Sequence, residues 1–123
     1  MHRRRRFFLA CLLGFAASAV LAQDVTQVAG GPETHKVVLD NDVVRMLDVR
    51  IPPGQTVAMH SHPANTVYFI TDCKLKVTGP DGKTTVAEPK AGTASYRGET
   101  KHAVENVGTA ECHLVQTELK EKK

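Results

Sequence analysis

Short apolar runs with a period of two dominate the chain from Lys36 onward. Val, Thr and Ile alternate with polar residues in these runs, and no stretch repeats its apolar residues at helical spacing. Side chains on a strand point alternately to opposite faces, so this pattern predicts an all-β domain of half-buried strands. The expected strands cover residues 36–39, 43–51, 56–62, 66–72, 74–78, 83–87, 93–96, 102–107 and 112–119.

Turn residues separate these runs at close intervals. The segment 52–54 is Pro-Pro-Gly, and the segment 79–82, Gly-Pro-Asp-Gly, has the composition of a hairpin turn. Many short strands joined by such turns indicate a β-sandwich or a barrel.

The first 22 residues differ in composition from the rest. Residues 3–6 are arginines, residues 7–17 form an apolar run, and Val-Leu-Ala at 20–22 fits a cleavage site. We interpret residues 1–22 as a signal peptide and expect a periplasmic or secreted protein that is not membrane-bound after cleavage. An uncleaved anchor is the alternative, and the choice between general secretion and twin-arginine export stays open.

Three parts are expected after the leader. Residues 23–35 are polar and glycine-containing and are expected to be a flexible lead-in; residues 36–119 form one domain, and residues 120–123 form a charged tail. The length suits a single domain with one modest core.

The basic balance of the chain belongs largely to its leader. The formal net charge is +3, but four of the sixteen basic residues and none of the thirteen acidic ones precede residue 23, which leaves 12 basic against 13 acidic residues, a net charge of −1. With this charge and no Trp, we expect no nucleic-acid partner.

Cys73 and Cys112 are the cysteines that remain after the leader. In an oxidising compartment the pair can form a disulfide, while two buried thiols that act as small apolar residues are the alternative. The sequence leaves both readings open.

Histidines give the strongest chemical signal. Residues two apart on a strand share a face, so Ala58, His60 and His62 are expected on one face and Val57 on the other. Two imidazoles at this spacing can converge on one divalent metal ion. If the strand that carries His102 lies alongside, a three-nitrogen site results.

Gly54 is followed after five residues by His60 and then His62, and His102 precedes Asn106 by four positions. This pattern resembles the two motifs of the cupin superfamily over essentially the whole domain. The resemblance implies a double-stranded β-barrel, or jelly roll, that holds a metal ion inside through His60, His62 and His102.

The second cupin motif is only partly kept, since its proline is absent, and two positions depart from the first motif. Thr66 stands where the first motif has a glutamate, and Cys73 replaces its closing glycine. A neutral hydroxyl is a far poorer ligand than a carboxylate, so one metal position is expected to be open. Cupin dioxygenases with three-histidine iron sites make this compatible with activity, whereas loss of activity together with the acid is the alternative.

The resemblance implies a protein that binds a divalent metal ion and a small polar molecule. If it is an enzyme, an iron-dependent dioxygenase is expected, with iron favoured over zinc, manganese or nickel. A non-catalytic binding or sensing module is the alternative function, and a zinc-stabilised structural domain is a third. Pairing of sheet edges into a homodimer is a further option.

Thr66, Tyr68 and Asn106 are expected beside the substrate, and Tyr68 and Tyr96 are the candidate catalytic residues. The alternative for Tyr68 is a core position with a locally bonded hydroxyl, and for Asn106 it is the fixing of a turn.

Arg45 and Arg97 could clamp a carboxylate substrate, with surface exposure as the alternative for each. His35, at the end of the expected lead-in, is assigned no role.

Overall fold

Residues 23–123, described by a computed structural model, form nine strands after two single-turn helical segments. The expected signal peptide, residues 1–22, lies outside the described residues. All nine expected strands are found, with ends shifted by at most three residues. The elements are η1 (Val25–Gln27), α1 (Gly31–Thr34), β1 (His35–Asp40), β2 (Val44–Ile51), β3 (Thr56–His62), β4 (Asn65–Phe69), β5 (Leu75–Thr78), β6 (Thr84–Ala87), β7 (Ala94–Arg97), β8 (Thr100–Asn106) and β9 (Cys112–Leu119).

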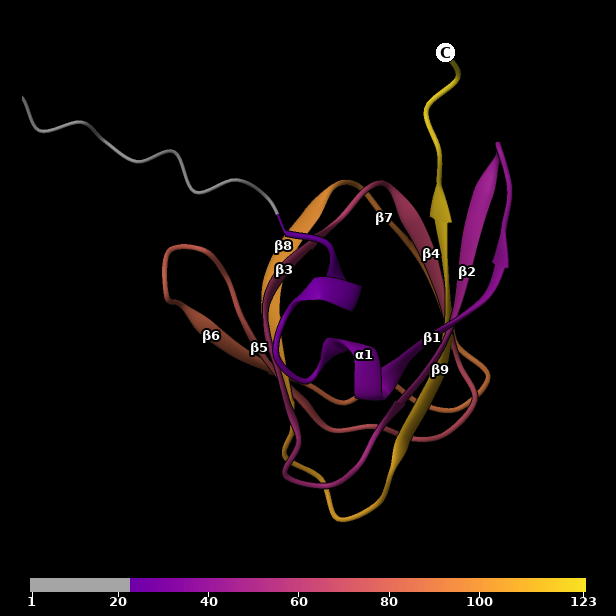
Figure 1. Ribbon diagram of the computed structural model, residues 1–123. Helices are drawn as coiled ribbons and strands as arrows, with labels where there is room; N and C mark the ends of the chain where they lie inside the picture. Colours follow the sequence, from indigo (N-terminus) through magenta and orange to yellow (C-terminus); the bar gives the residue numbers. More distant parts are fainter. Residues whose placement is uncertain (1–22) are drawn as a thin grey trace, which may run out of the picture.

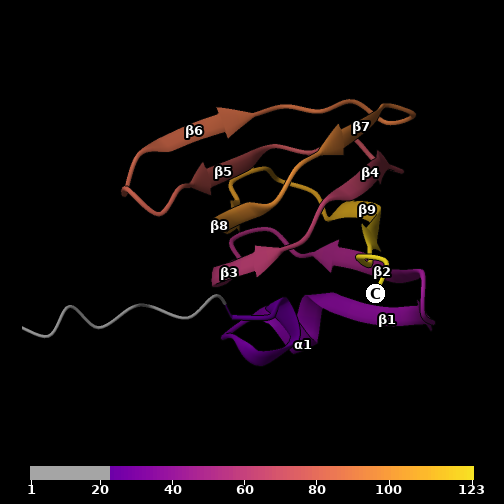
Figure 2. The same cartoon turned by 90° about the horizontal axis from the view of Figure 1, so that it is seen from above.

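The strands form two antiparallel sheets that face each other (Figure 1). One sheet has the order β1-β2-β9-β4-β7 and the other the order β3-β8-β5-β6. Seen from above, the two sheets form separate layers, with η1 and α1 at one side (Figure 2). The predictions of an all-β fold and of a jelly-roll arrangement of two facing sheets are confirmed.

The core lies between the two sheets and follows from the alternation of the strands. On β9, for example, buried residues at positions 112, 114, 116 and 118 alternate with partly exposed ones. Each fully buried Val, Leu or Phe side chain contributes about 1.5–3 kcal/mol. The buried apolar cluster consists of Val25, Val28, Leu47, Val49, Ile51, Val57, Val67, Phe69, Cys73, Leu75, Val104, Cys112 and Leu114.

A bulge interrupts the alternation of β3. Val57 lies opposite Val104 and His60 lies opposite His102, so β3 has one residue more than β8 between these pairs. As a result Val57 and His60 are both buried although they are three residues apart. The prediction that Val57 faces away from the histidines is therefore wrong, because a bulge re-aims the side chains that follow it.

The segment before β1 packs along β3. Its Gln23 carbonyl accepts a hydrogen bond from the Ser61 N–H (2.7 Å), its Ala29 carbonyl accepts one from the Ala58 N–H (2.9 Å), and Val25 is fully buried. Residues 23–35 thus form an ordered part of the domain and differ in this from the flexible lead-in that we predicted. The segment supplies partners for the backbone at the edge of β3.

Cys73 and Cys112 form a disulfide with a Cα–Cα distance of 5.0 Å. This decides between the two readings that the sequence left open. Cys112 is the first residue of β9, and Cys73 lies just before β5, so the bond connects the two sheets.

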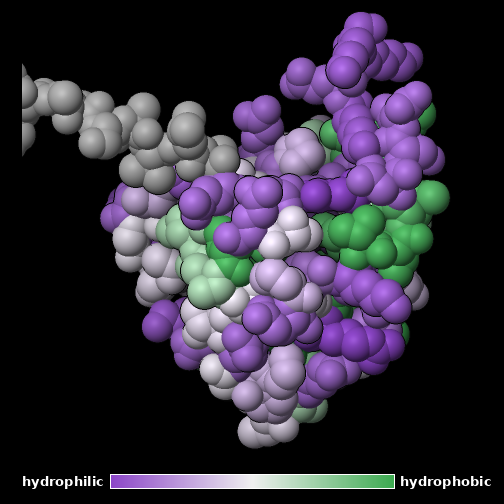
Figure 3. Space-filling model, in the orientation of Figure 1, coloured by the Kyte–Doolittle hydropathy of each residue, from purple (hydrophilic) through white to green (hydrophobic). Residues whose placement is uncertain are grey.

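The face of the molecule in Figure 3 combines polar surface with a hydrophobic patch on the side of β1 and β2. Val37, Val38, Leu39 and Val43 are large exposed apolar residues in this region. β1 is an edge strand, and its free edge could pair with that of a second copy. The homodimer stays a prediction. No helix among residues 23–123 is long and apolar enough to span a membrane.

Candidate metal centre and ligand cavity

Four histidine rings meet between the sheets. His60 and His62 come from β3 and His102 from the adjacent β8, while His35 comes from β1 in the opposite sheet. The ring centroid of His60 lies 4.7 Å from that of His62, 4.8 Å from that of His102 and 6.0 Å from that of His35. All four side chains are buried. The three histidines of the sequence motif do come together, and the structure adds a fourth.

Hydrogen bonds orient the two motif histidines of β3. The His60 Nδ1 donates to the Ala58 carbonyl (2.6 Å) at the bulge, and the His62 Nδ1 donates to the Glu118 carboxylate (3.0 Å). Since a carbonyl and an ionised carboxylate only accept, both rings carry their proton on Nδ1. The Nε2 atom of each ring is left for another partner.

His35 is held in the same way. Its Nδ1 lies 2.8 Å from the Thr34 hydroxyl, and that hydroxyl donates to the Gly30 carbonyl. The hydroxyl oxygen therefore accepts from Nδ1–H, and the Nε2 of His35 is also free to bind a metal ion.

The cluster fits a divalent metal ion. The His60 Nε2 is buried without a hydrogen-bond partner among the described residues, and such an atom costs about 1–3 kcal/mol. Ligand nitrogens of His35, His60 and His62 all lie within 4.8 Å of one another. With metal–nitrogen bonds of about 2.1 Å, small ring movements would close this site around an ion. Imidazole donors suit iron, zinc and nickel.

Burial keeps three of the four rings neutral. Desolvation, together with a smaller effect of the neighbouring imidazoles, lowers the pKa of His35 to about 3, of His60 to about 4 and of His102 to about 3. Metal ligation requires neutral imidazoles, so no proton has to be displaced from these three rings at neutral pH.

A buried carboxylate supports the site from behind. Glu118, which is 2% exposed, accepts hydrogen bonds from the His62 ring and from the Arg45 Nε (2.5 Å), and Arg45 also pairs with Asp24 (2.5 Å). Burial raises the pKa of Glu118, but hydrogen bonds from His62 and Arg45 outweigh it and lower the pKa below its ordinary value. The ionised carboxylate fixes the orientation of the His62 ring. Arg45 is bound to these acids, so the prediction that it clamps a substrate is wrong.

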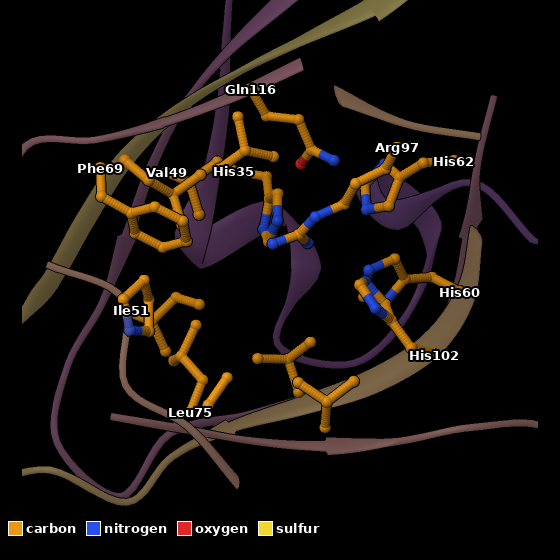
Figure 4. Close-up of a pocket in the computed structure, with 16 residues that line it drawn as sticks. His35, Val49, Ile51, His60, His62, Phe69, Leu75, Arg97, His102 and Gln116 are labelled. Atoms are coloured by element: carbon orange, nitrogen blue, oxygen red, sulfur yellow. The ribbon is translucent and has the colours of Figure 1, made fainter. Parts of the chain in front are cut away.

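A cavity of about 280 Å³ opens in front of the histidines (Figure 4). Figure 4 shows His60, His62 and His102 at one end, with Phe69 and Ile51 at the other. The volume is close to the lower limit of ordinary ligand pockets, about 300 Å³. The lining residues are His35, Val49, Ile51, His60, His62, Val67, Phe69, Leu75, Val77, Ala87, Pro89, Arg97, His102, Val104, Leu114 and Gln116.

Three of the residues expected at the site lie on the outer face of the sheet. Thr66 and Tyr68 are exposed because they alternate on β4 with the buried Val67 and Phe69. Tyr96, opposite Thr66 on β7, is 67% exposed. The structure therefore contradicts Thr66 and Tyr68 as substrate-pocket residues and Tyr68 and Tyr96 as candidate catalytic residues.

Asn106 is buried but lies outside the cavity lining. Its amide donates to the Ile51 carbonyl (2.7 Å) and the Ala110 carbonyl (2.9 Å), and its side-chain oxygen accepts from the Gly108 N–H (2.9 Å). The structure thus shows the turn-fixing role and not the expected pocket position.

His35 and Glu118 are the residues that the sequence interpretation missed. Alternation along the last strand, where Leu114 and Gln116 share a face with Glu118, would have indicated that Glu118 points inward. His35 begins β1 and lies opposite the buried Val49, a pairing that no local pattern signals.

A family model described as the cupin domain matches residues 47–117, more than half of the chain. The chain therefore belongs to the cupin family. No match was found among curated proteins.

Solved structures agree with this family. A cupin domain from Bordetella pertussis Tohama I is 28% identical with a TM-score of 0.67, and the match covers 71% of this chain and 92% of that one. An RmlC-like cupin family protein with a double-stranded β-helix fold from Methanocaldococcus jannaschii (12% identity, TM-score 0.58, 70% and 78% covered) shares the fold. So does a protein from Bacillus halodurans (16% identity, TM-score 0.58, 73% and 72% covered).

Proposed function

We propose that this protein is an exported cupin that binds one divalent metal ion through its buried histidines and a small molecule in the adjoining cavity. The observation that carries the proposal is the buried, unpartnered Nε2 of His60, which is surrounded by three further imidazoles. The disulfide supports export, because such bonds persist in oxidising compartments.

His60 and His62, both on β3, are the first two ligands of the proposed set. His102 joins them from the neighbouring strand, as the cupin motif implies, and His35 approaches from the opposite sheet. Because Thr66 points outward, we assign to His35 the fourth ligand position that a motif glutamate would otherwise occupy. The ligand set is then four imidazoles.

When bound, the metal ion supplies Lewis-acid chemistry and, if it is iron, oxidation that depends on dioxygen. Glu118 and the Ala58 carbonyl hold the His62 and His60 rings in place, and the apolar wall limits the access of water. If the protein is an enzyme, a dioxygenase that uses iron is the proposed activity; zinc, manganese and nickel are the alternative metals.

Elemental analysis of protein purified anaerobically without a histidine tag tests the metal site. We expect about one metal ion per chain, and near-complete loss in His62→Ala. His113→Ala is the matched control, because His113 pairs with Asp48 on the outer side of β9 and does not line the cavity. Unchanged metal content in His62→Ala would refute the site. His35→Ala and His102→Ala then measure the contribution of each remaining histidine.

A non-catalytic binding or sensing module is the second candidate. It is favoured by the cavity lining of the described chain, which contains no carboxylate, hydroxyl or thiol for proton transfer or nucleophilic attack. Oxygen consumption by iron-loaded protein with a panel of small substrates separates the two functions. Tight ligand binding without turnover would favour the module.

Cell fractionation tests the proposed location. We expect the protein in the periplasm or medium with the Cys73–Cys112 bond intact, which a mobility assay with a thiol-reactive polymer reports. Recovery of reduced protein from the cytoplasm would contradict this.

A further inference from the structure

Arg97 is the one cationic side chain other than histidine that lines the cavity within residues 23–123. It is the last residue of β7 and is partly buried, and Figure 4 shows its side chain extending into the cavity. None of the hydrogen bonds and ion pairs within the described chain involves its guanidinium group. Burial lowers the pKa of Arg97, with no opposing effect from an acid.

The two acids beside the histidine cluster are not available to Arg97. Glu118 and Asp24 are both bound by Arg45, which leaves these three side chains with a net charge of −1. A divalent ion at the histidine cluster would add two positive charges to that of Arg97. The cavity is therefore electrostatically suited to an anion.

A guanidinium group presents a planar fork of N–H donors that matches a carboxylate in two parallel hydrogen bonds. Partial burial of a guanidinium group without a partner costs free energy. An anion that pairs with the group recovers part of this cost, which increases the affinity for the anion.

The remaining walls select the body of the ligand. Phe69, Ile51 and Leu75 are among the apolar residues that line the end of the cavity away from the three motif histidines (Figure 4). Polar atoms of a ligand would find few partners there and would lose their hydration. Burial of an apolar body contributes about 25 cal/mol of favourable free energy for each Å² of apolar surface removed from water.

We propose that the ligand is a small monocarboxylate with an apolar body, whose carboxylate pairs with Arg97 and whose body fills the apolar end of the cavity. This deepens the proposed function, on which it rests for the ligand cavity beside the metal ion. A dicarboxylate would place its second charged group against the apolar end of the cavity, and a phosphate ion would leave that end unfilled.

Calorimetric titration of the metal-loaded protein with hexanoate and with hexanamide tests the proposal. The two probes have the same apolar tail, but only hexanoate carries a charge. We expect hexanoate to bind at least tenfold more tightly than hexanamide, and acetate to bind more weakly than hexanoate. Arg97→Gln should abolish the preference for hexanoate, and Arg97→Lys should restore part of it.

Arg50→Gln is the matched control, because it removes the same charge from an arginine that is 54% exposed and pairs with Asp48 and Glu111. This variant should keep the preference, and melting temperatures should show that all variants are folded. An unchanged preference in Arg97→Gln would overturn the proposal. So would phosphate that binds more tightly than hexanoate and depends on Arg97.

Metal content, measured on the same samples, separates the two proposals. Binding of hexanoate that depends on Arg97 in protein that takes up no metal would refute the metal site and support the monocarboxylate ligand. Stoichiometric metal without any binding of hexanoate would support the metal site and overturn the monocarboxylate ligand.

Discussion

Replacement of Glu118 by Gln gives the most direct test of how the histidine site is supported. Glu118 is 2% exposed, and its carboxylate accepts charge-assisted hydrogen bonds from Arg45 and from the His62 Nδ1. Glu118→Gln keeps the size of the side chain but removes its charge and one of its two acceptor atoms.

The size of the effect follows from these contacts. A hydrogen bond to a charged group contributes about 1.5–3 kcal/mol, and one of the two is lost. Arg45 keeps its ion pair with Asp24, so the cost should stay below the roughly 3–5 kcal/mol of a fully broken buried pair. We expect the free energy of unfolding to fall by about 2–3 kcal/mol. The affinity for metal should fall by about 10–100-fold, because Glu118 orients a ligand.

Competition with a chromophoric chelator for zinc gives the affinity, and urea unfolding of the metal-free protein gives the stability. Glu111→Gln is the control, since Glu111 is 47% exposed and pairs with an exposed arginine. A surface change of this kind should alter the stability by less than about 0.5 kcal/mol. If Glu118→Gln lowers the stability but leaves the zinc affinity within twofold, His62 does not bind the metal and the reasoning is refuted.

Three further predictions concern stability. Replacement of Cys73 and Cys112 by Ser should lower the free energy of unfolding by about 4 kcal/mol, because the bond closes a loop of 39 residues; a urea titration that shows less than about 1 kcal/mol would contradict this. Asn106→Ala should lose two donated hydrogen bonds and one accepted hydrogen bond and cost about 2–3 kcal/mol while the metal content stays unchanged; loss of metal would instead indicate that Asn106 belongs to the site. The metal-free protein should lose stability as the pH falls below about 6.5, because three buried histidines have folded pKa values of about 3 to 4 and the unfolded chain binds more protons in that range. Urea midpoints at pH 7 and pH 5 that agree would refute the last prediction.

Alternation along the chain was sufficient to predict the nine strands, because most buried positions are apolar and each turn contains Gly, Pro or Asp. The convergence of His60, His62 and His102 was predictable for the same reason. It depended on the pairing of β3 with β8, which the structure contains.

Other features depend on contacts that no local pattern encodes. On β4 both faces carry large apolar or aromatic side chains, so alternation alone could not decide whether Tyr68 or Val67 points inward. The bulge at residues 58–59 arises from pairing with β8, and the place of His35 depends on the packing of residues 23–34 against β3. The unpaired state of Arg97 likewise emerges only when the whole cavity is assembled.

The disulfide has a mechanical consequence for the cavity. Cys73 lies two residues before Leu75, Cys112 lies two residues before Leu114, and both leucines line the cavity wall. The covalent bond therefore fixes the distance between the two sheets at this point, and they can separate only at places away from it. We therefore expect the motions that admit a ligand to occur at the rim remote from the disulfide, and we expect reduction to release this restraint.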